Sequence, residues 1–196
     1  MNENIIKIMP ATVADQKRIL ELEQTILSDM ELAVYQDLTI EQVQTAMLQA
    51  AKQDPKSRYH FSQAIVAKDA NKTVVGVLFG YPAEQEAGLD LTFQRILAER
   101  YDYHELFFPD SEVYENEWYL DSISIDENVR GQGVGSMLLT AMNQFAAQAE
   151  AHVIGLNVDD GNPKALQLYE RIGFSEVGRL KIGPHQYAHL QRQIKP

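Results

Sequence analysis

The 196-residue chain contains no cysteine. Disulfides, thiolate metal ligands and cysteine nucleophiles are therefore excluded. No stretch of the sequence approaches the roughly 18 apolar residues that a membrane helix needs. The first residues do not form a basic segment followed by an apolar one, so we expect no signal peptide and a cytoplasmic location.

Positive charge is also scarce. Lys and Arg number 17 against 28 Asp and Glu, for a formal net charge of −11. An acidic chain repels phosphate backbones, so we expect no nucleic-acid partner, whereas cationic small molecules and basic peptide segments are attracted. Hydrophobic residues (45%) and charged residues (23%) occur in ordinary globular proportions, and the length suits one domain over residues 1–196.

The hydrophobic pattern predicts an α/β fold. Strand and helix signals follow the order βααββ, then an insertion, then βαβαββ. Thr12 and Thr39 are predicted to cap the two N-terminal helices. The insertion, residues 82–117, is rich in aromatic and acidic side chains and is too short to form a core of its own.

A glycine-rich segment follows the expected strand at 118–125. It reads Arg130-Gly-Gln-Gly-Val-Gly135 and opens an amphipathic helix. Glycines at a helix N-terminus let backbone N–H groups converge on a phosphate, and Arg130 adds a cation. The glycine spacing does not fit the dinucleotide fingerprint, and Ser136 follows where the phosphate-loop motif has lysine. Alone, the segment is equally compatible with a plain tight turn.

A second motif narrows the interpretation. Residues 162–174 read Asn-Pro-x-Ala-x-x-x-Tyr-x-x-x-Gly-Phe. With the glycine-rich segment, which matches a Q/R-x-x-G-x-G/A pyrophosphate loop, this block makes residues 118–174 resemble the GNAT superfamily of acyl-CoA-dependent N-acyltransferases. The resemblance implies a mixed, mostly antiparallel sheet with splayed central parallel strands, flanked by helices.

The resemblance also implies a cofactor site for acetyl-CoA as co-substrate, with no metal. The amides of residues 132–136 would hold the pyrophosphate, and the backbone of residues 123–125 would pair with pantetheine. Asn157 and Asn162 would lie near the pantetheine amides and Lys164 near the phosphates. Tyr169 would lie beside the sulfur and protonate the leaving thiolate. The residues expected to contact the cofactor are Ile123, Ser124, Ile125, Arg130, Gly131, Gln132, Gly133, Val134, Gly135, Ser136, Asn157, Asn162, Lys164, Ala165 and Tyr169.

The chemistry needs few further groups. Without cysteine there is no acyl-cysteine intermediate, so we expect direct transfer to a primary amine within a ternary complex. Glu117 and Asp121 have the same strand parity, and either is a candidate general base. The alternative is that Glu117 is a solvated acid and Asp121 makes a structural hydrogen bond. His185 and His189, near a closing strand, could relay a proton or be structural.

The acceptor is expected to be a cation. The acids of the insertion suit an ammonium group, although they could equally form a solvated face, and the aromatics could line a pocket or pack over the sheet. The sequence thus predicts an N-acetyltransferase acting on a small amine or a peptide amine, and a homodimer would fit the family. The alternative is a CoA-binding regulatory module with little catalysis, and a nucleotide-binding domain is disfavoured by the glycine spacing.

Overall fold

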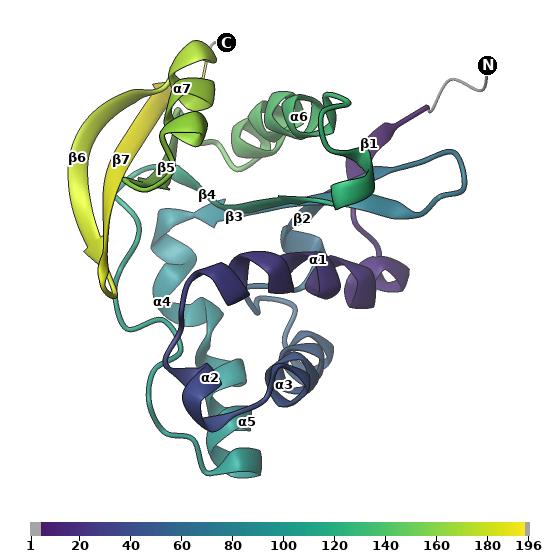
Figure 1. Cartoon of the computed structure of the whole chain (residues 1–196), viewed down its shortest axis with the longest axis vertical. Helices are drawn as coiled ribbons and strands as arrows, with labels where there is room; N and C mark the ends of the chain where they lie inside the picture. Colours follow the sequence, from purple (N-terminus) through teal and green to yellow (C-terminus); the bar gives the residue numbers. More distant parts are fainter. Residues whose placement is uncertain (1–4, 195–196) are drawn as a thin grey trace. The chain divides into compact units, whose positions relative to one another are not determined.

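We describe the protein from a computed structural model, which covers residues 5–194. Residues 1–4, on which the signal-peptide expectation depends, lie outside this range. The strands form a seven-stranded sheet in the order β1-β2-β3-β4-β5-β7-β6 (Figure 1). The strands are β1 (Lys7–Pro10), β2 (Ala64–Lys68), β3 (Val74–Pro82), β4 (Trp118–Ile125), β5 (Val153–Asp159), β6 (Ser175–Ile182) and β7 (His185–Gln193).

The helices begin where capping residues predict. Thr39 forms a reciprocal capping box with Gln42, and Thr12 does the same with Asp15. The α-helices are α1 (Gln16–Asp29), α2 (Val34–Asp37), α3 (Ile40–Gln53), α4 (Glu86–Leu89), α5 (Leu91–Tyr101), α6 (Val134–Gln148) and α7 (Pro163–Arg171). Single 3-10 turns are η1 (Val13–Asp15), η2 (Phe61–Gln63), η3 (Ala83–Gln85) and η4 (Glu127–Val129).

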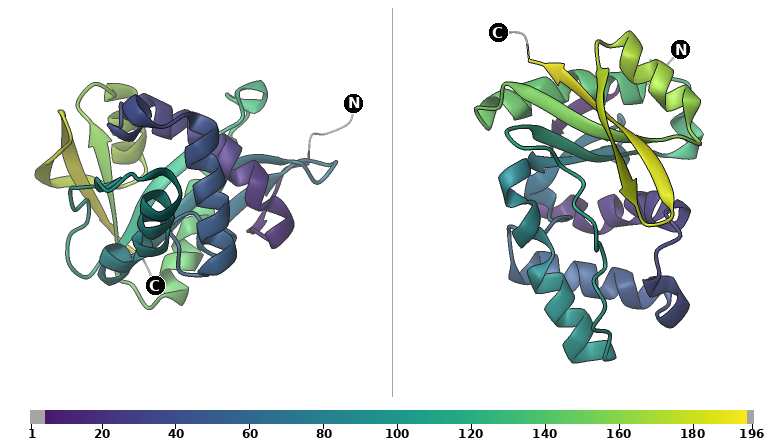
Figure 2. Two further views of the ribbon diagram at one scale, coloured as in Figure 1. Left: turned by 90° about the horizontal axis from the view of Figure 1, so that it is seen from below. Right: turned by 90° about the vertical axis from the view of Figure 1, so that its left-hand side faces the viewer.

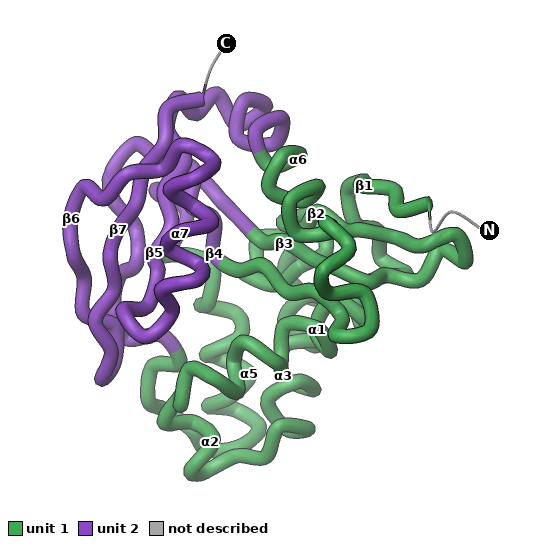
Figure 3. Tube along the Cα trace, turned by 45° about the horizontal axis from the view of Figure 1, so that its top comes forward, with its two compact units in different colours: residues 1–79, 87–107, 122–142 green, residues 80–86, 108–121, 143–196 purple. Residues whose placement is uncertain are grey.

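The chain divides into two compact units (Figure 3). Unit 1 comprises residues 1–79, 87–107 and 122–142. In unit 1, α1 and α6 lie on opposite sides of the strands (Figure 1). Ser124 donates a hydrogen bond to the Leu22 carbonyl of α1 at 2.8 Å. On the other side, Gly76 of β3 leaves room for Ile125 and for Leu138 of α6, since a Cβ there would lie 2.9 and 3.2 Å from their side chains.

Unit 2 comprises residues 80–86, 108–121 and 143–196. Its β5, β7 and β6 pair antiparallel, and α7 packs beside β5 (Figure 2). The pairing of β4 with β5 is parallel, and the register links only Trp118 with Ile154 and Tyr119 with Gly155. This parallel pair within a mostly antiparallel sheet confirms the expected mixed sheet.

The structure agrees with most of the predicted elements, and helix α2 was not predicted. Within the 82–117 insertion, residues 87–107 belong to unit 1 and residues 82–86 and 108–117 to unit 2. Within unit 1, α5 packs against α3, and Phe93 and Phe107 meet edge to face at 5.0 Å. These two aromatics, both buried, pack in the core of unit 1.

Candidate active site

The glycine-rich loop in unit 1 has the backbone that phosphate binding requires. Gly131 and Gly133 have φ angles of +77° and +80°, and a Cβ at either would meet no atom within 4 Å. Both glycines are exposed, whereas Val134, at the start of α6, is buried and fixes the helix. The first turn of a helix has N–H groups without intrahelical partners. These are the amides of residues 134–136, which directly follow the two glycines of positive φ.

The segment before the loop is held by an acidic cap. The Asp126 side chain accepts a hydrogen bond from the Asn128 amide at 2.9 Å and pairs with Arg18 of α1. The Asn128 backbone bond contributes most to lowering the pKa of Asp126, and the charge of Arg18 lowers it further. Arg130 donates to the Ile125 carbonyl at 3.3 Å and is exposed. The cation expected near a pyrophosphate is therefore accessible to solvent.

The second motif lies on α7 in unit 2. Asn162 caps this helix, accepting from the Ala165 amide at 3.1 Å, and Pro163 occupies the first turn, where its missing N–H is tolerated. The side chain of Asn162 thus has a structural role, and Lys164 is exposed. Tyr169 lies on the buried side of α7, its ring 5.8 Å from that of Phe174. Burial raises the pKa of Tyr169 to about 12, so the phenol stays protonated at neutral pH.

Glu117 is not a solvated acid. Its side chain has no exposed surface, and its carboxylate meets Nε2 of His189, also fully buried, at 3.0 Å. The amide of Tyr114 and the side chain of Gln191 each donate to it at 2.8 Å. From the sequence, Glu117 could have been a solvated acid and His189 a structural residue. The solvated-acid alternative is wrong, because strand β7 supplies donors that the local sequence does not reveal.

Asn157 joins the same buried group. Its Nδ2 donates to the Glu112 carbonyl at 2.8 Å and lies 3.0 Å from the Tyr119 hydroxyl, and its Oδ1 lies 2.7 Å from Nδ1 of His189. The side-chain amide is therefore occupied by other residues of unit 2. The part of Asn157 that remains for a pantetheine amide is its backbone.

Asp121 lies in a second polar group, on β3 and β4. Tyr81 donates to Asp121 at 3.3 Å, and Tyr119 donates to the buried Glu112 at 2.9 Å. The Tyr119 pKa lies well above 10, because the ring is buried and because Glu112, Tyr81 and Asp121 lie close. Asp121 is half-buried, unlike Glu117. The two candidate bases thus have different partners, and the surroundings of Asp121 are electronegative.

The acids of the insertion divide into two kinds. Glu112 and Glu117 are buried, which corrects the expectation of a solvated acidic face. Glu84 and Glu115 are exposed and border a pocket of about 600 Å³ in unit 2. Tyr114 also lines that pocket, and the ring of Tyr114 stacks on the His189 imidazole at 3.9 Å.

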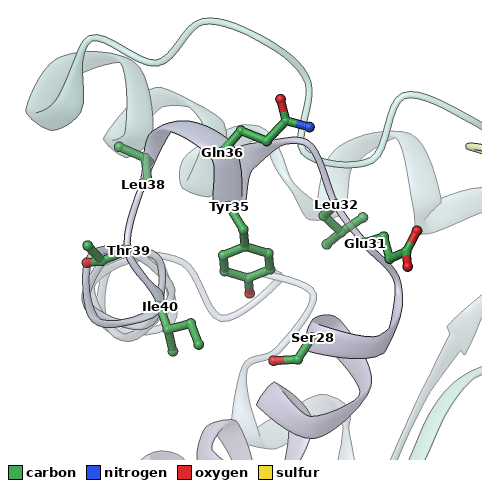
Figure 4. Close-up of a pocket in the computed structure, with 8 residues that line it drawn as sticks. All are labelled: Ser28, Glu31, Leu32, Tyr35, Gln36, Leu38, Thr39 and Ile40. Carbon is green, nitrogen blue, oxygen red and sulfur yellow. The ribbon is translucent and has the colours of Figure 1, made fainter.

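A pocket in unit 1 was not predicted. It has a volume of about 530 Å³ and lies where α1, α2 and α3 meet (Figure 4). The Tyr35 ring lies between Ser28 and Ile40 in this view, and its hydroxyl is 3.0 Å from Gln24. Burial raises the Tyr35 pKa, and the charge of Glu23 raises it further. The only sequence signal was the short apolar and aromatic segment before Thr39.

The comparisons with known proteins agree with the motifs and the fold. The model of the acetyltransferase (GNAT) family matches residues 27–174. A solved acetyltransferase structure is 36% identical, with a TM-score of 0.84 over 96% of this chain and all of the other. An N-acetyltransferase from Staphylococcus aureus Mu50 is 26% identical, also with a TM-score of 0.84, over 95% of this chain and all of the other. The chain belongs to the GNAT acetyltransferase family, whose co-substrate is acetyl-CoA.

Two curated relatives are named for their acceptors. The peptidyl-lysine N-acetyltransferase YjaB of Salmonella typhimurium is 34% identical over 33% of this chain and 41% of its own length. The spermine/spermidine N(1)-acetyltransferase of Bacillus subtilis is 36% identical over 32% of this chain and 41% of its own length. The matches therefore span less than half of each relative.

Residues 5–194 contain neither a membrane-spanning helix nor a cluster of metal ligands. No helix in this range is long and apolar enough to cross a bilayer. No group of three or more His, Cys, Asp or Glu side chains in the range is placed to hold a metal ion.

Proposed function

We propose that the protein transfers the acetyl group of acetyl-CoA directly to a cationic primary amine. The observation that carries the proposal is the loop at 130–135. It has positive φ at Gly131 and Gly133 and opens onto the first turn of α6, within a chain that belongs to an acetyltransferase family. Backbone amides arranged in this way suit the CoA pyrophosphate.

Family membership supports a proposal for the remaining cofactor contacts. We propose that the backbone of residues 123–125 and of Asn157 pairs with pantetheine, and that Arg130 and Lys164, both exposed cations, approach the phosphates. Asn162 and Ala165 contribute by starting α7, which carries Tyr169. Tyr169 donates its phenolic proton to the thiolate. The raised pKa keeps the phenol in its donor form over the working pH range.

The amine must first lose a proton. Asp121 is half-buried, whereas Glu117 is fully buried, so we assign the base to Asp121, acting directly or through water. Glu117 was the other candidate base from the sequence. Its complete burial and its three donors support a role that does not require contact with the amine. The amine nitrogen then bonds to the thioester carbon, the C–S bond breaks, and the thiolate takes the Tyr169 proton. The nitrogen, now bonded to carbon, loses its second proton, which returns to the Tyr169 phenolate directly or through water.

Three observations support a cationic acceptor. The net charge is −11. Exposed Glu84 and Glu115 border the unit 2 pocket beside the Tyr114 ring, and carboxylates with an aromatic face suit an ammonium group. Lysine side chains, spermine and spermidine, for which the two curated relatives are named, are all cationic amines.

The test is a mass-spectrometric screen of amines with acetyl-CoA and the purified protein. The panel contains polyamines, lysine peptides, aminoglycosides and matched neutral and anionic amines. We expect acetylation of cationic amines, with a KM that rises with salt because charge attraction is screened over about 8–10 Å. A preference for neutral or anionic amines would remove the cation argument.

The second candidate is a CoA-binding regulatory module. It is favoured only by the burial of Glu117, which takes one carboxylate away from direct catalysis. Binding of acetyl-CoA without turnover of any amine in the screen would support it. A cytoplasmic location and a homodimer stay predictions.

A further inference from the structure

Glu117 and His189 form a buried pair that the mechanism above does not use. Both side chains have no exposed surface, and Oε2 of Glu117 lies 3.0 Å from Nε2 of His189. Burying ionisable groups costs several kcal/mol unless each is paired and hydrogen-bonded. Here both are fully bonded: the carboxylate also accepts from the Tyr114 amide and from Gln191.

The hydrogen bonds of Asn157 fix the state of the His189 ring. The Glu112 carbonyl can only accept, so the atom of Asn157 that faces it at 2.8 Å is the amide nitrogen. The other atom, Oδ1, therefore faces Nδ1 of His189 at 2.7 Å, and Nδ1 must carry a hydrogen. The contact between Nε2 and Glu117 then needs one more proton, since otherwise two lone pairs would meet. The pair shares that single proton.

The pair lies where β4 and β5 separate. Glu117 immediately precedes β4, and the last paired residues are Tyr119 and Gly155. Asn157 is two residues beyond Gly155 on β5, so His189 holds the first separated part of that strand. Gly155 leaves the space for the carboxylate, because a Cβ there would lie 1.8 Å from Oε2 of Glu117.

We propose that His189 is a positioning residue for acetyl transfer. This inference rests on the proposed function. His189 shares one proton with Glu117 and sets the position of β5 at Asn157. The backbone of Asn157 is where we propose that pantetheine pairs, so this contact sets the place of the thioester. Displacing reactants by about 1 Å can cost on the order of 10²-fold in rate, whereas cofactor affinity depends mainly on the pyrophosphate loop.

The central variants are Glu117→Gln and His189→Ala. Glutamine keeps the shape of Glu117 and can donate to a neutral imidazole, so the contact persists without the shared proton. Because the contact persists, we expect Glu117→Gln to lower kcat by less than His189→Ala does. His189→Ala should lower kcat by about 10²-fold while acetyl-CoA affinity, measured by calorimetry, stays unchanged. His152→Gln, an exposed histidine in the same unit, is the matched control and should behave as wild type.

Two conservative variants keep the test usable if His189→Ala does not fold. In His189→Asn, the side-chain nitrogen lies near the position of Nδ1 and keeps the hydrogen bond to Asn157. In His189→Gln, the side-chain nitrogen lies near the position of Nε2 and keeps the hydrogen bond to Glu117. Because the effect passes through Asn157, His189→Asn should retain more kcat than His189→Gln. The reverse order, or a folded His189→Ala enzyme with wild-type kcat, would contradict the proposal. A large loss of kcat in Glu117→Gln with a flattened acidic limb would instead make Glu117 the base.

A measurement without turnover separates this inference from the proposed function. Nitrogen-15 NMR of the His189 ring should show slowly exchanging hydrogens. If the shared proton sits on His189, both ring nitrogens carry one. If it sits on Glu117, only Nδ1 carries one and Nε2 accepts a hydrogen bond. In Glu117→Gln only Nδ1 should be protonated. A rapidly exchanging ring would contradict the shared proton even if the enzyme is active. An inactive wild type with the expected ring signals would count against the proposed function alone.

Discussion

Replacing Gly133 by valine tests the pyrophosphate assignment. The residue has φ of +80°, where a β-branched residue is strained by about 1–2 kcal/mol. Nothing lies within 4 Å of a Cβ built there, so the strain comes from the backbone alone. Typical domains are stable by about 5–15 kcal/mol, so the variant should stay folded.

The backbone relieves the strain by rotating, which turns the neighbouring amides away from the phosphate. A hydrogen bond to a charged group contributes about 1.5–3 kcal/mol, so losing one weakens acetyl-CoA binding by roughly 10- to 150-fold. Isothermal titration calorimetry measures the affinity, and circular dichroism with a thermal melt checks the fold.

Gly135→Ala is the matched control. This glycine has no positive φ, and a Cβ would only touch Ile125 at 3.9 Å. Alanine within a helix is favoured over glycine by about 0.5–1 kcal/mol, and the motif accepts alanine at this position. We expect unchanged affinity and a slightly higher melting temperature. Wild-type affinity in Gly133→Val, or equal losses in both variants, would refute the assignment.

Other predictions concern chemistry and stability. Tyr169→Phe should lower kcat by about 10²-fold with unchanged acetyl-CoA affinity, and wild-type kcat should show no loss from phenol ionisation until near pH 12; a steady-state pH profile checks both. Asp121→Asn should lower kcat/KM and remove its acidic limb, whereas superimposable pH profiles would exclude it as base. Burial raises the pKa of Asp15, but hydrogen bonds from Lys68 and Thr12 lower it by more, so the net pKa lies below the ordinary value of 3.8. Ionised Asp15 therefore stabilises the fold above pH 3.8, and this stabilisation is lost as the pH falls further. Urea unfolding measured at a series of pH values should show a smaller loss at low pH in Asp15→Asn than in the wild type. Gly155→Ala should cost about 1–3 kcal/mol in urea unfolding, because its Cβ would overlap a buried carboxylate.

Features set by neighbouring residues were predictable from sequence. The Thr39 cap, Pro163 at the start of α7 and the positive φ of Gly173 each depend on a few adjacent residues. The same holds for the glycine-rich loop, whose conformation follows from residues 130–135 alone. Such local rules located most strands and helices and both family motifs.

Features that depend on distant segments were not predictable in the same way. Strand β7 lies between β5 and β6 in the sheet, and no local pattern states that order. The burial of Glu117 depends on this strand order, because its partners His189 and Gln191 come 72 and 74 residues later in the chain. Next to Glu115 and Asn116, the residue has the local context of a solvated acid.

One local signal did point to the buried pair. Gly155 interrupts an otherwise apolar and β-branched run on β5, and a glycine inside a strand often marks a close approach by another group. The group proves to be a carboxylate rather than a backbone, which a single sequence does not specify. Because any side chain at 155 would displace Glu117, the geometry of the pair is specified jointly from β4, β5 and β7. A catalytic role assigned to Glu117 from its position next to β4 alone leaves out β5 and β7, which supply the space for its carboxylate and two of its hydrogen-bond partners.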